Sequence, residues 1–193
     1  MQSGQKYHAN NPITLKITIM RYLKIIFYTI FLILLVIQLD AQSIVNQGIK
    51  VGNKAPEIIE NSVLGRPIRL SSLAGKIVLI DFWASWCRPC RNENPFVVSA
   101  YDKFKEGNFK GGKGFTIFSV SLDRDLNAWK NAIQSDHLKW ETNVCAPSGK
   151  ADYVQTYEIE SIPSNFLVDG NGIILAVNLR GEALAQKLAS LKK

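Results

Sequence analysis

Residues 77–90 read IVLIDFWASWCRPC, and this stretch decides the fold. Its first eight residues form an almost continuous apolar and aromatic run, which is typical of a strand buried on both faces of a parallel sheet. The run ends shortly before Cys87 and Cys90. A disulfide between these cysteines would close a loop of only four residues, too short to stabilise a fold usefully. Chemistry therefore explains the pair better than stability does.

The residues that follow alternate between helix-like and strand-like patterns. Apolar side chains recur at helical spacing over residues 96–104, so a helix is expected after the cysteines. Residues 115–122 predict a second buried strand, and the next amphipathic helix, around Trp129, is expected to have Asp123 or Asp125 as its N-cap. This alternation predicts an α/β fold, and 193 residues with 47% hydrophobic content favour one main domain.

Turn residues predict two hairpins beside this core. Near the front, residues 57–62 and 67–70 surround a Leu-Gly turn. Towards the C-terminus, residues 165–169 and 173–178 are strand-like runs joined by Gly-Asn-Gly. A last helix with leucines on one face is expected over residues 184–191.

The N-terminal segment has the pattern of an export signal. Residues 25–37 read IIFYTIFLILLVI without a charge and follow Arg21 and Lys24. This run is shorter than the ~20 residues of a transmembrane helix and fits the ~7 to 15 apolar residues of a signal peptide. Because Met20 directly precedes the charged residues, we expect translation to start there and residues 1–19 to be an extension without structure.

Two fates of residues 20–41 fit this pattern. A signal peptidase would cut after Ala41, before Gln42, and release residues 42–193 as the mature domain. An uncut segment would instead anchor the domain at the outer face of the inner membrane. Both fates predict an exported protein in the periplasm.

The charge of the mature domain argues against one class of partner. Residues 42–193 contain 19 Lys and Arg against 15 Asp and Glu. This small excess of positive charge is not typical of a nucleic-acid-binding surface. Glycines and Glu106 also interrupt the lysine cluster over residues 103–113. We therefore expect a solvated loop there and no nucleic-acid partner.

The motifs around the cysteines resemble the thioredoxin superfamily. They are DFWASWCRPC at residues 81–90, Pro95 five residues after the second cysteine, and Ile162-Pro163 far downstream. The front hairpin, VGNKAP at 51–56 and LSSLAGK at 70–76 narrow the resemblance to the exported TlpA/ResA-type thiol-disulfide oxidoreductases. The resemblance covers residues 50–193 and implies a three-layer thioredoxin-like fold, with a mixed central sheet flanked by helices and an extra N-terminal β-hairpin.

The resemblance assigns the redox step to Cys87 and Cys90. Cys87 would begin a helix, where unpaired backbone N–H groups and the helix dipole stabilise a thiolate, so it is the expected nucleophile. Arg88 should lower the pKa of this thiol further. Cys90 would resolve the mixed disulfide by attacking the Cys87 sulfur, which gives the Cys87–Cys90 redox disulfide. No dissociable cofactor is implied.

Two carboxylates are expected to assist the thiols. Asp81 stands where thioredoxins carry a buried aspartate, whose raised pKa would let it accept the proton of Cys90. The alternative for Asp81 is a hydrogen-bonded strand residue. Glu93 matches an active-site glutamate of the ResA-type proteins and could tune the same thiols, and its alternative is an ordinary exposed helix carboxylate.

Three residues are expected to bind the client. Pro163 resembles the family's cis-proline, which would lie against the disulfide and leave the Ile162 backbone free to pair with a client strand, and its alternative is a trans-proline in a loop. Trp86 should flank the docked client, whereas Trp83 should pack in the core.

Cys145 lies outside these motifs and is expected to be a small buried residue. No metal site is expected, because further ligands at workable spacing are missing.

These assignments predict a thiol-disulfide oxidoreductase that reduces disulfides of exported clients, either an apocytochrome c with its CxxCH thiols or oxidised proteins generally. In an oxidising compartment its dithiol must be reduced again after each turnover, which by family analogy implies a membrane thiol donor of the DsbD/CcdA type.

Two alternatives to this function stay open. A peroxiredoxin-like thiol peroxidase shares the fold, but its PxxxTxxC context is missing around Cys87. A non-catalytic thioredoxin-fold binding module should have lost one cysteine or the Ile-Pro, and both are present.

Overall fold

The computed structural model describes residues 12–40, 46–145 and 152–193. The chain divides into two units, residues 1–44 and 45–193, and each is described by itself.

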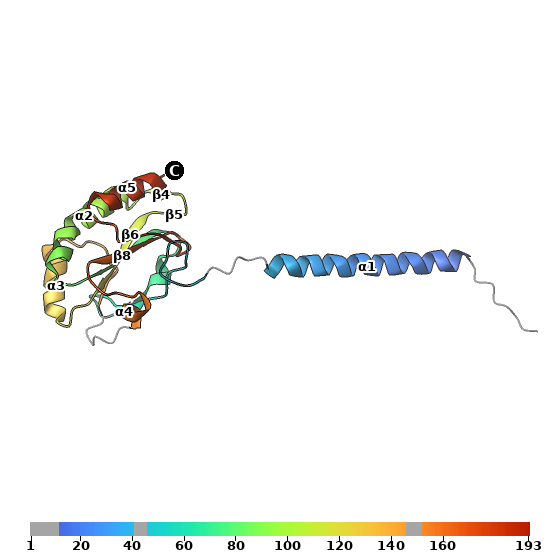
Figure 1. The fold of residues 1–193 in the computed structure, drawn as a ribbon, viewed down its shortest axis with the longest axis horizontal. Helices are drawn as coiled ribbons and strands as arrows, with labels where there is room; N and C mark the ends of the chain where they lie inside the picture. The colour runs from blue at the N-terminus through green and yellow to red at the C-terminus, as the bar shows by residue number, and fades with distance from the viewer. Residues whose placement is uncertain (1–11, 41–45, 146–151) are drawn as a thin grey trace, which may run out of the picture. The chain divides into compact units, whose positions relative to one another are not determined.

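In the first unit, the described residues form helix α1 (Pro12–Asp40), drawn in blue in Figure 1. Because α1 begins before Met20, the expectation that residues 1–19 carry no structure is wrong for residues 12–19. Within the described part of the chain, no helix has an apolar stretch long enough to cross a membrane. The cleavage site expected after Ala41 lies outside the described residues.

The second unit is built on a five-stranded sheet with the order β7-β6-β3-β8-β9. The strands are β3 (Ile77–Trp83), β6 (Phe115–Ser121), β7 (Asn143–Cys145), β8 (Ser164–Val168) and β9 (Ile174–Val177). The central strand β3 pairs in parallel with β6 and antiparallel with β8, so the sheet is mixed. Every residue of β3 is buried, which confirms the buried strand predicted from its continuous apolar run.

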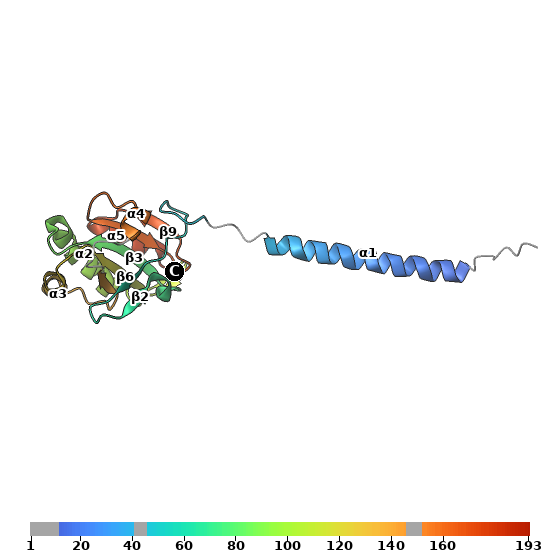
Figure 2. The ribbon, with the colours of Figure 1, turned by 90° about the horizontal axis from the view of Figure 1, so that it is seen from below.

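Helices cover both faces of this sheet, as Figures 1 and 2 show. Helices α2 (Arg88–Phe104), α3 (Leu126–Ser135) and α5 (Glu182–Leu191) pack on one face. The short helix α4 (Asp152–Thr156) and the 3₁₀ helix η1 (Leu70–Leu73) pack on the other. The three layers confirm the predicted thioredoxin-like α/β architecture.

Side chains of β3 alternate between the two faces. Leu79 and Trp83 belong to the core under α2 and α5, whereas Ile80 and Phe82 belong to the core under α4. Asp81 therefore lies on the face that α2 covers.

Both predicted hairpins are present. Strands β1 (Ile59–Asn61) and β2 (Pro67–Arg69) pair antiparallel at the front, and β8 pairs antiparallel with β9. Gly65 adopts a φ of 73° in the first turn, a conformation that side chains with a Cβ rarely adopt. The extra N-terminal hairpin is thus confirmed.

Some details differ from the sequence expectations. The lysine-rich segment was expected to be a solvated loop. Its lysines are exposed, but the segment contains a small hairpin of β4 (Asn108–Phe109) and β5 (Gly112–Lys113). Phe96 lies on the exposed side of α2, because the buried stripe of that helix runs through Val97, Ala100 and Phe104. Neither the three-residue strand β7 nor α4 was expected, and both are too short to give a periodic signal.

Candidate active site

Cys87 and Cys90 form a disulfide at the start of α2. Cys87 is the N-cap of this helix, and the backbone N–H of Cys90 points at its sulfur, 3.2 Å away. Both cysteines are almost completely buried, with 5% and 2% of their surface exposed. A helix N-terminus and a directed N–H group both stabilise a thiolate, so reduction of this disulfide would leave Cys87 as the better nucleophile.

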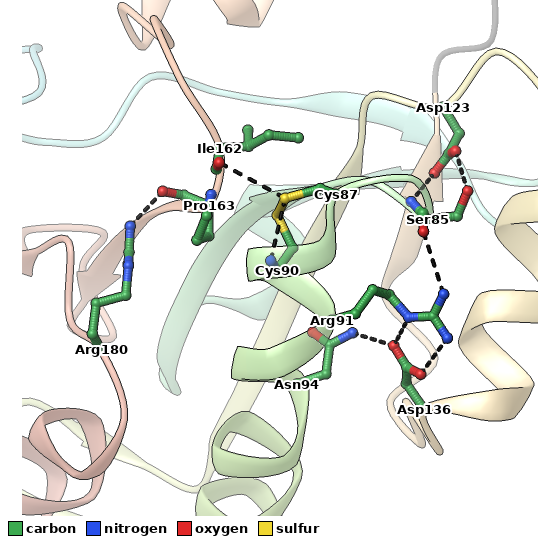
Figure 3. The surroundings of a disulfide bond; sticks show 10 residues. All are labelled: Ser85, Cys87, Cys90, Arg91, Asn94, Asp123, Asp136, Ile162, Pro163 and Arg180. Atoms are coloured by element: carbon green, nitrogen blue, oxygen red, sulfur yellow. Dashed lines mark hydrogen bonds and ion pairs between the residues drawn. A yellow bond between two sulfur atoms is a disulfide. The ribbon is translucent and has the colours of Figure 1, made fainter.

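The loop that precedes the disulfide is tied to the end of strand β6. The Asp123 carboxylate accepts hydrogen bonds from the backbone N–H of Ser85 at 2.8 Å and from its hydroxyl at 2.6 Å (Figure 3). The hydroxyl of Ser121 donates to the same carboxylate at 2.7 Å. Asp123 was expected as an alternative N-cap of α3, but Asp125 caps that helix by accepting from two backbone N–H groups.

A second set of polar contacts joins α2 to the end of α3. Arg91 forms an ion pair with Asp136, in which Nη2 lies 2.6 Å from Oδ1, and Asn94 donates to the same carboxylate. Arg91 also donates to the carbonyl oxygen of Ser85 at 3.3 Å. Figure 3 shows both networks converging on this loop, so Ser85 is held from two sides.

The predicted client-binding residues lie at the disulfide. The Ile162–Pro163 peptide bond is cis, as the resemblance implied. The carbonyl oxygen of Ile162 lies 3.7 Å from the Cys87 sulfur (Figure 3). Next to the disulfide in sequence, Trp86 is 66% exposed, whereas Trp83 is fully buried in the core. The structure therefore places the Ile162 carbonyl at the Cys87 sulfur and an exposed indole directly before Cys87 in the chain.

Asp81 lies in the middle of the central strand, opposite Ser119 of β6 and Asn165 of β8. Burial raises the pKa of its carboxyl to about 7, while the charge of Arg180 lowers that pKa and the charge of Glu93 raises it. Asp81 therefore changes its protonation state near neutral pH, as an acid or base for thiol chemistry must.

Glu93 lies on α2, one turn after Cys90, and is partly buried. Its Oε2 accepts a hydrogen bond of 2.8 Å from the backbone N–H of Gly181, which immediately precedes α5. Gly181 has φ 51° and ψ −129°, a conformation in which only glycine is comfortable. Glu93 is therefore a fixed part of the site rather than a freely exposed helix carboxylate.

Cys145 ends strand β7 and is buried, as expected. Its thiol lies 3.3 Å from the carbonyl oxygen of Asp123, and burial raises its pKa to about 11. A thiol with these properties is mostly protonated and shielded at neutral pH, so it is a poor nucleophile.

Sequence reasoning missed four residues that hold the site: Ser85, Arg91, Asp136 and Arg180. Their partners are distant in sequence, so no local motif marks them. One usable signal was present for Asp123, because it follows a strand parallel to β3 and so reaches the same sheet edge as the cysteines.

Known proteins are similar to this chain. A thioredoxin-like family model matches residues 75–174. The thiol-disulfide oxidoreductase ResA of Bacillus thuringiensis subsp. konkukian (strain 97-27) is 30% identical over 144 residues, which cover 75% of this chain and 78% of the relative. ResA of Bacillus subtilis (strain 168) is 28% identical over 131 residues, 68% of each chain. The thioredoxin domain of a thiol-disulfide oxidoreductase from Bacteroides vulgatus has a TM-score of 0.67 at 35% identity and covers 73% of this chain and 96% of that one.

Proposed function

The chain belongs to the thioredoxin-like family, among the TlpA/ResA-type thiol-disulfide oxidoreductases, and from this we propose that it reduces disulfides of exported proteins through Cys87 and Cys90. The observation that carries the proposal is the disulfide at the start of α2, beside the carbonyl of Ile162. In its reduced form this pair holds the two electrons that a client disulfide needs.

The first step is attack by Cys87 on the client. The Cys87 thiolate bonds to one client sulfur, the client S–S bond breaks, and the other client sulfur leaves as a thiolate that takes up a proton. The N–H of Cys90 and the N-terminus of α2 favour the attacking thiolate. The product is a mixed disulfide between Cys87 and the client.

The second step releases the client. The Cys90 thiol gives its proton to the Asp81 carboxylate and attacks the Cys87 sulfur. The Cys87–Cys90 disulfide forms, and the remaining client sulfur leaves as a thiolate and is protonated. The client has gained two electrons from the two cysteines. It has also gained two protons: one is the Cys90 proton, released again by Asp81, and the other comes from the solvent, which received the Cys87 proton when the thiolate formed. With a pKa of about 7, Asp81 supplies a useful fraction of carboxylate at neutral pH.

The client is an extended segment around a disulfide. Its backbone pairs with that of Ile162, beside Pro163, and the exposed indole of Trp86 covers its apolar side. An apocytochrome c with an oxidised CxxCH pair has this chemistry, as do oxidised exported proteins generally.

Each turnover leaves the protein oxidised, so the cycle needs a donor of two electrons. A membrane thiol protein of the DsbD/CcdA type would supply them by thiol–disulfide exchange with the Cys87–Cys90 disulfide. In this proposal the domain works in the periplasm, with residues 20–41 either removed as a signal peptide or retained as an anchor. N-terminal sequencing of the protein from the cell envelope separates the two, since cleavage gives Gln42 as the first residue.

Trapping of mixed disulfides tests the proposal. Cys90→Ser keeps the nucleophile but lacks the resolving thiol, so it should accumulate a mixed disulfide with insulin, and Cys87→Ser should trap little. Equal trapping by both variants would remove the assignment of Cys87. A wild-type protein that consumes peroxide faster than it reduces insulin would be a peroxidase, and one that does neither would be a binding module.

A further inference from the structure

The segment between β9 and α5 contacts the client-binding side of the disulfide site. Arg180, in this segment, donates a hydrogen bond to the carbonyl oxygen of Pro163 (Figure 3). It also donates to the carbonyl oxygen of Leu179. Pro163 directly follows Ile162, whose carbonyl faces the Cys87 sulfur. The guanidinium therefore links the segment before α5 to the segment before β8, which carries the client-pairing backbone.

The same segment is fixed next to both acids of the site. The amide of Asn165, which pairs with Asp81 in the sheet, bonds both the N–H and the carbonyl of Leu179 at 2.8 Å. Gly181, two residues after Leu179, donates its N–H to the Glu93 carboxylate. Arg180 thus stands between two anchored residues, and its position relative to the acids is determined by the fold.

The hydrogen bonds of Arg180 leave its charge available. Both acceptors, on Pro163 and Leu179, are neutral carbonyl oxygens, and within the described residues Arg180 forms no ion pair. A guanidinium stays protonated at all relevant pH values, and its field is strong near a buried carboxylate. Arg180 is therefore a fixed positive charge beside a pair of acids.

We propose that Arg180 is a positioning residue of the disulfide site: it fixes the Pro163 carbonyl for the client strand and places a positive charge next to the acids of the site. The proposal rests on the reductase function, in which the Asp81 carboxylate takes the proton of Cys90. One side chain would then couple client binding to proton transfer.

The charged and titratable groups that face Asp81 decide the sign of the effect. Helix α2 contributes Glu93, the β9–α5 segment contributes Arg180, and the neighbours on β6 and β8 are an uncharged serine and asparagine. The two cysteines do not titrate in the oxidised chain. Loss of the positive charge should raise the pKa of Asp81 above about 7, whereas loss of the negative charge of Glu93 should lower it. Shifts in opposite directions are not expected from general loosening of the site.

The experiment measures the titration of the Asp81 carboxyl carbon by NMR in the full oxidised chain. The variants are Arg180→Met, Arg180→Gln and Glu93→Gln, with Arg66→Met as a control, because Arg66 is exposed in the turn between β1 and β2. We expect the midpoint to rise by about one pH unit in both Arg180 variants, to fall in Glu93→Gln and to stay unchanged in the control. The Gln variant covers the case in which Arg180→Met does not fold.

Client kinetics test whether Arg180 positions the Pro163 carbonyl for the client. The contact to the Pro163 carbonyl is made by Nη2 at the tip of the guanidinium, which neither methionine nor the shorter glutamine reproduces. Arg180→Met and Arg180→Gln should therefore both raise the KM for insulin several-fold, and Arg66→Met should leave it unchanged. An unchanged KM in Arg180→Met would overturn the role of Arg180 in client binding.

Two titration results would overturn the proposed effect of the Arg180 charge on Asp81. One is an Asp81 midpoint that does not rise in either Arg180 variant, and the other is a midpoint that rises equally in Arg66→Met. The titration needs no client, so it decides the role of Arg180 even if the protein fails to reduce insulin.

Discussion

Ser85 and Asp123, 38 residues apart in sequence, are joined by two hydrogen bonds from the serine N–H and hydroxyl to the carboxylate. Asp123 is 2% exposed, so these bonds form away from solvent, where an unpaired donor or acceptor is costly. The loop that carries Trp86 and Cys87 is thereby fixed to the end of β6 rather than left as a free connection.

Asp123→Asn should lower the unfolding free energy by about 2 kcal/mol, because an amide has one acceptor oxygen for three donors and adds two N–H donors of its own. Urea unfolding monitored by circular dichroism measures the change. Asp125→Asn is the matched control: asparagine caps helices as well as aspartate does, so α3 should keep its start. Equal stabilities of the two variants would contradict this account of Asp123.

Asp81→Asn should stabilise the protein at neutral and alkaline pH. The folded pKa of about 7 lies above the unfolded value, so the folded state holds a proton that the unfolded state loses between about pH 4 and pH 7. Wild-type stability should therefore fall as pH rises through this window, by up to about 4 kcal/mol at about 1.4 kcal/mol per pKa unit. The variant should lack this decline. Parallel pH profiles of unfolding free energy in the two proteins would rule out a raised pKa.

Trp86→Ala and Trp83→Ala should separate binding from stability. Trp86 is exposed, so its removal should change the unfolding free energy by less than about 0.5 kcal/mol while raising the KM for insulin. Trp83 is fully buried, and its removal should cost about 3 to 5 kcal/mol. Urea unfolding and insulin reduction measure both effects. A wild-type KM in Trp86→Ala would remove the indole from the client site.

Cys145 should be unreactive in the folded, oxidised protein. Burial and a pKa of about 11 leave little thiolate at pH 8, so iodoacetamide should label no thiol until urea exposes one. Mass spectrometry counts the labels, and Cys145→Ser is the control that should stay unlabelled in urea. Rapid labelling of the native protein would show that this thiol is accessible.

Local patterns in the sequence were enough to predict much of the fold. The apolar run of β3, the turn glycines of the two hairpins and the helical spacing after the cysteines each depend on neighbouring residues, and each was found where expected. The cysteine pair belongs to this class too, because a spacing of three residues places both sulfurs on the first turn of a helix.

The surroundings of the cysteines were decided only by the tertiary structure. Asp123 reaches Ser85 because β6 lies parallel to β3 and ends at the same edge of the sheet. Arg180 reaches Pro163 because the β8–β9 hairpin brings its two ends together. Periodicity and turn chemistry act over a few residues, whereas the hydrogen bonds and charges that tune a buried site act between side chains that only the folded sheet brings into contact.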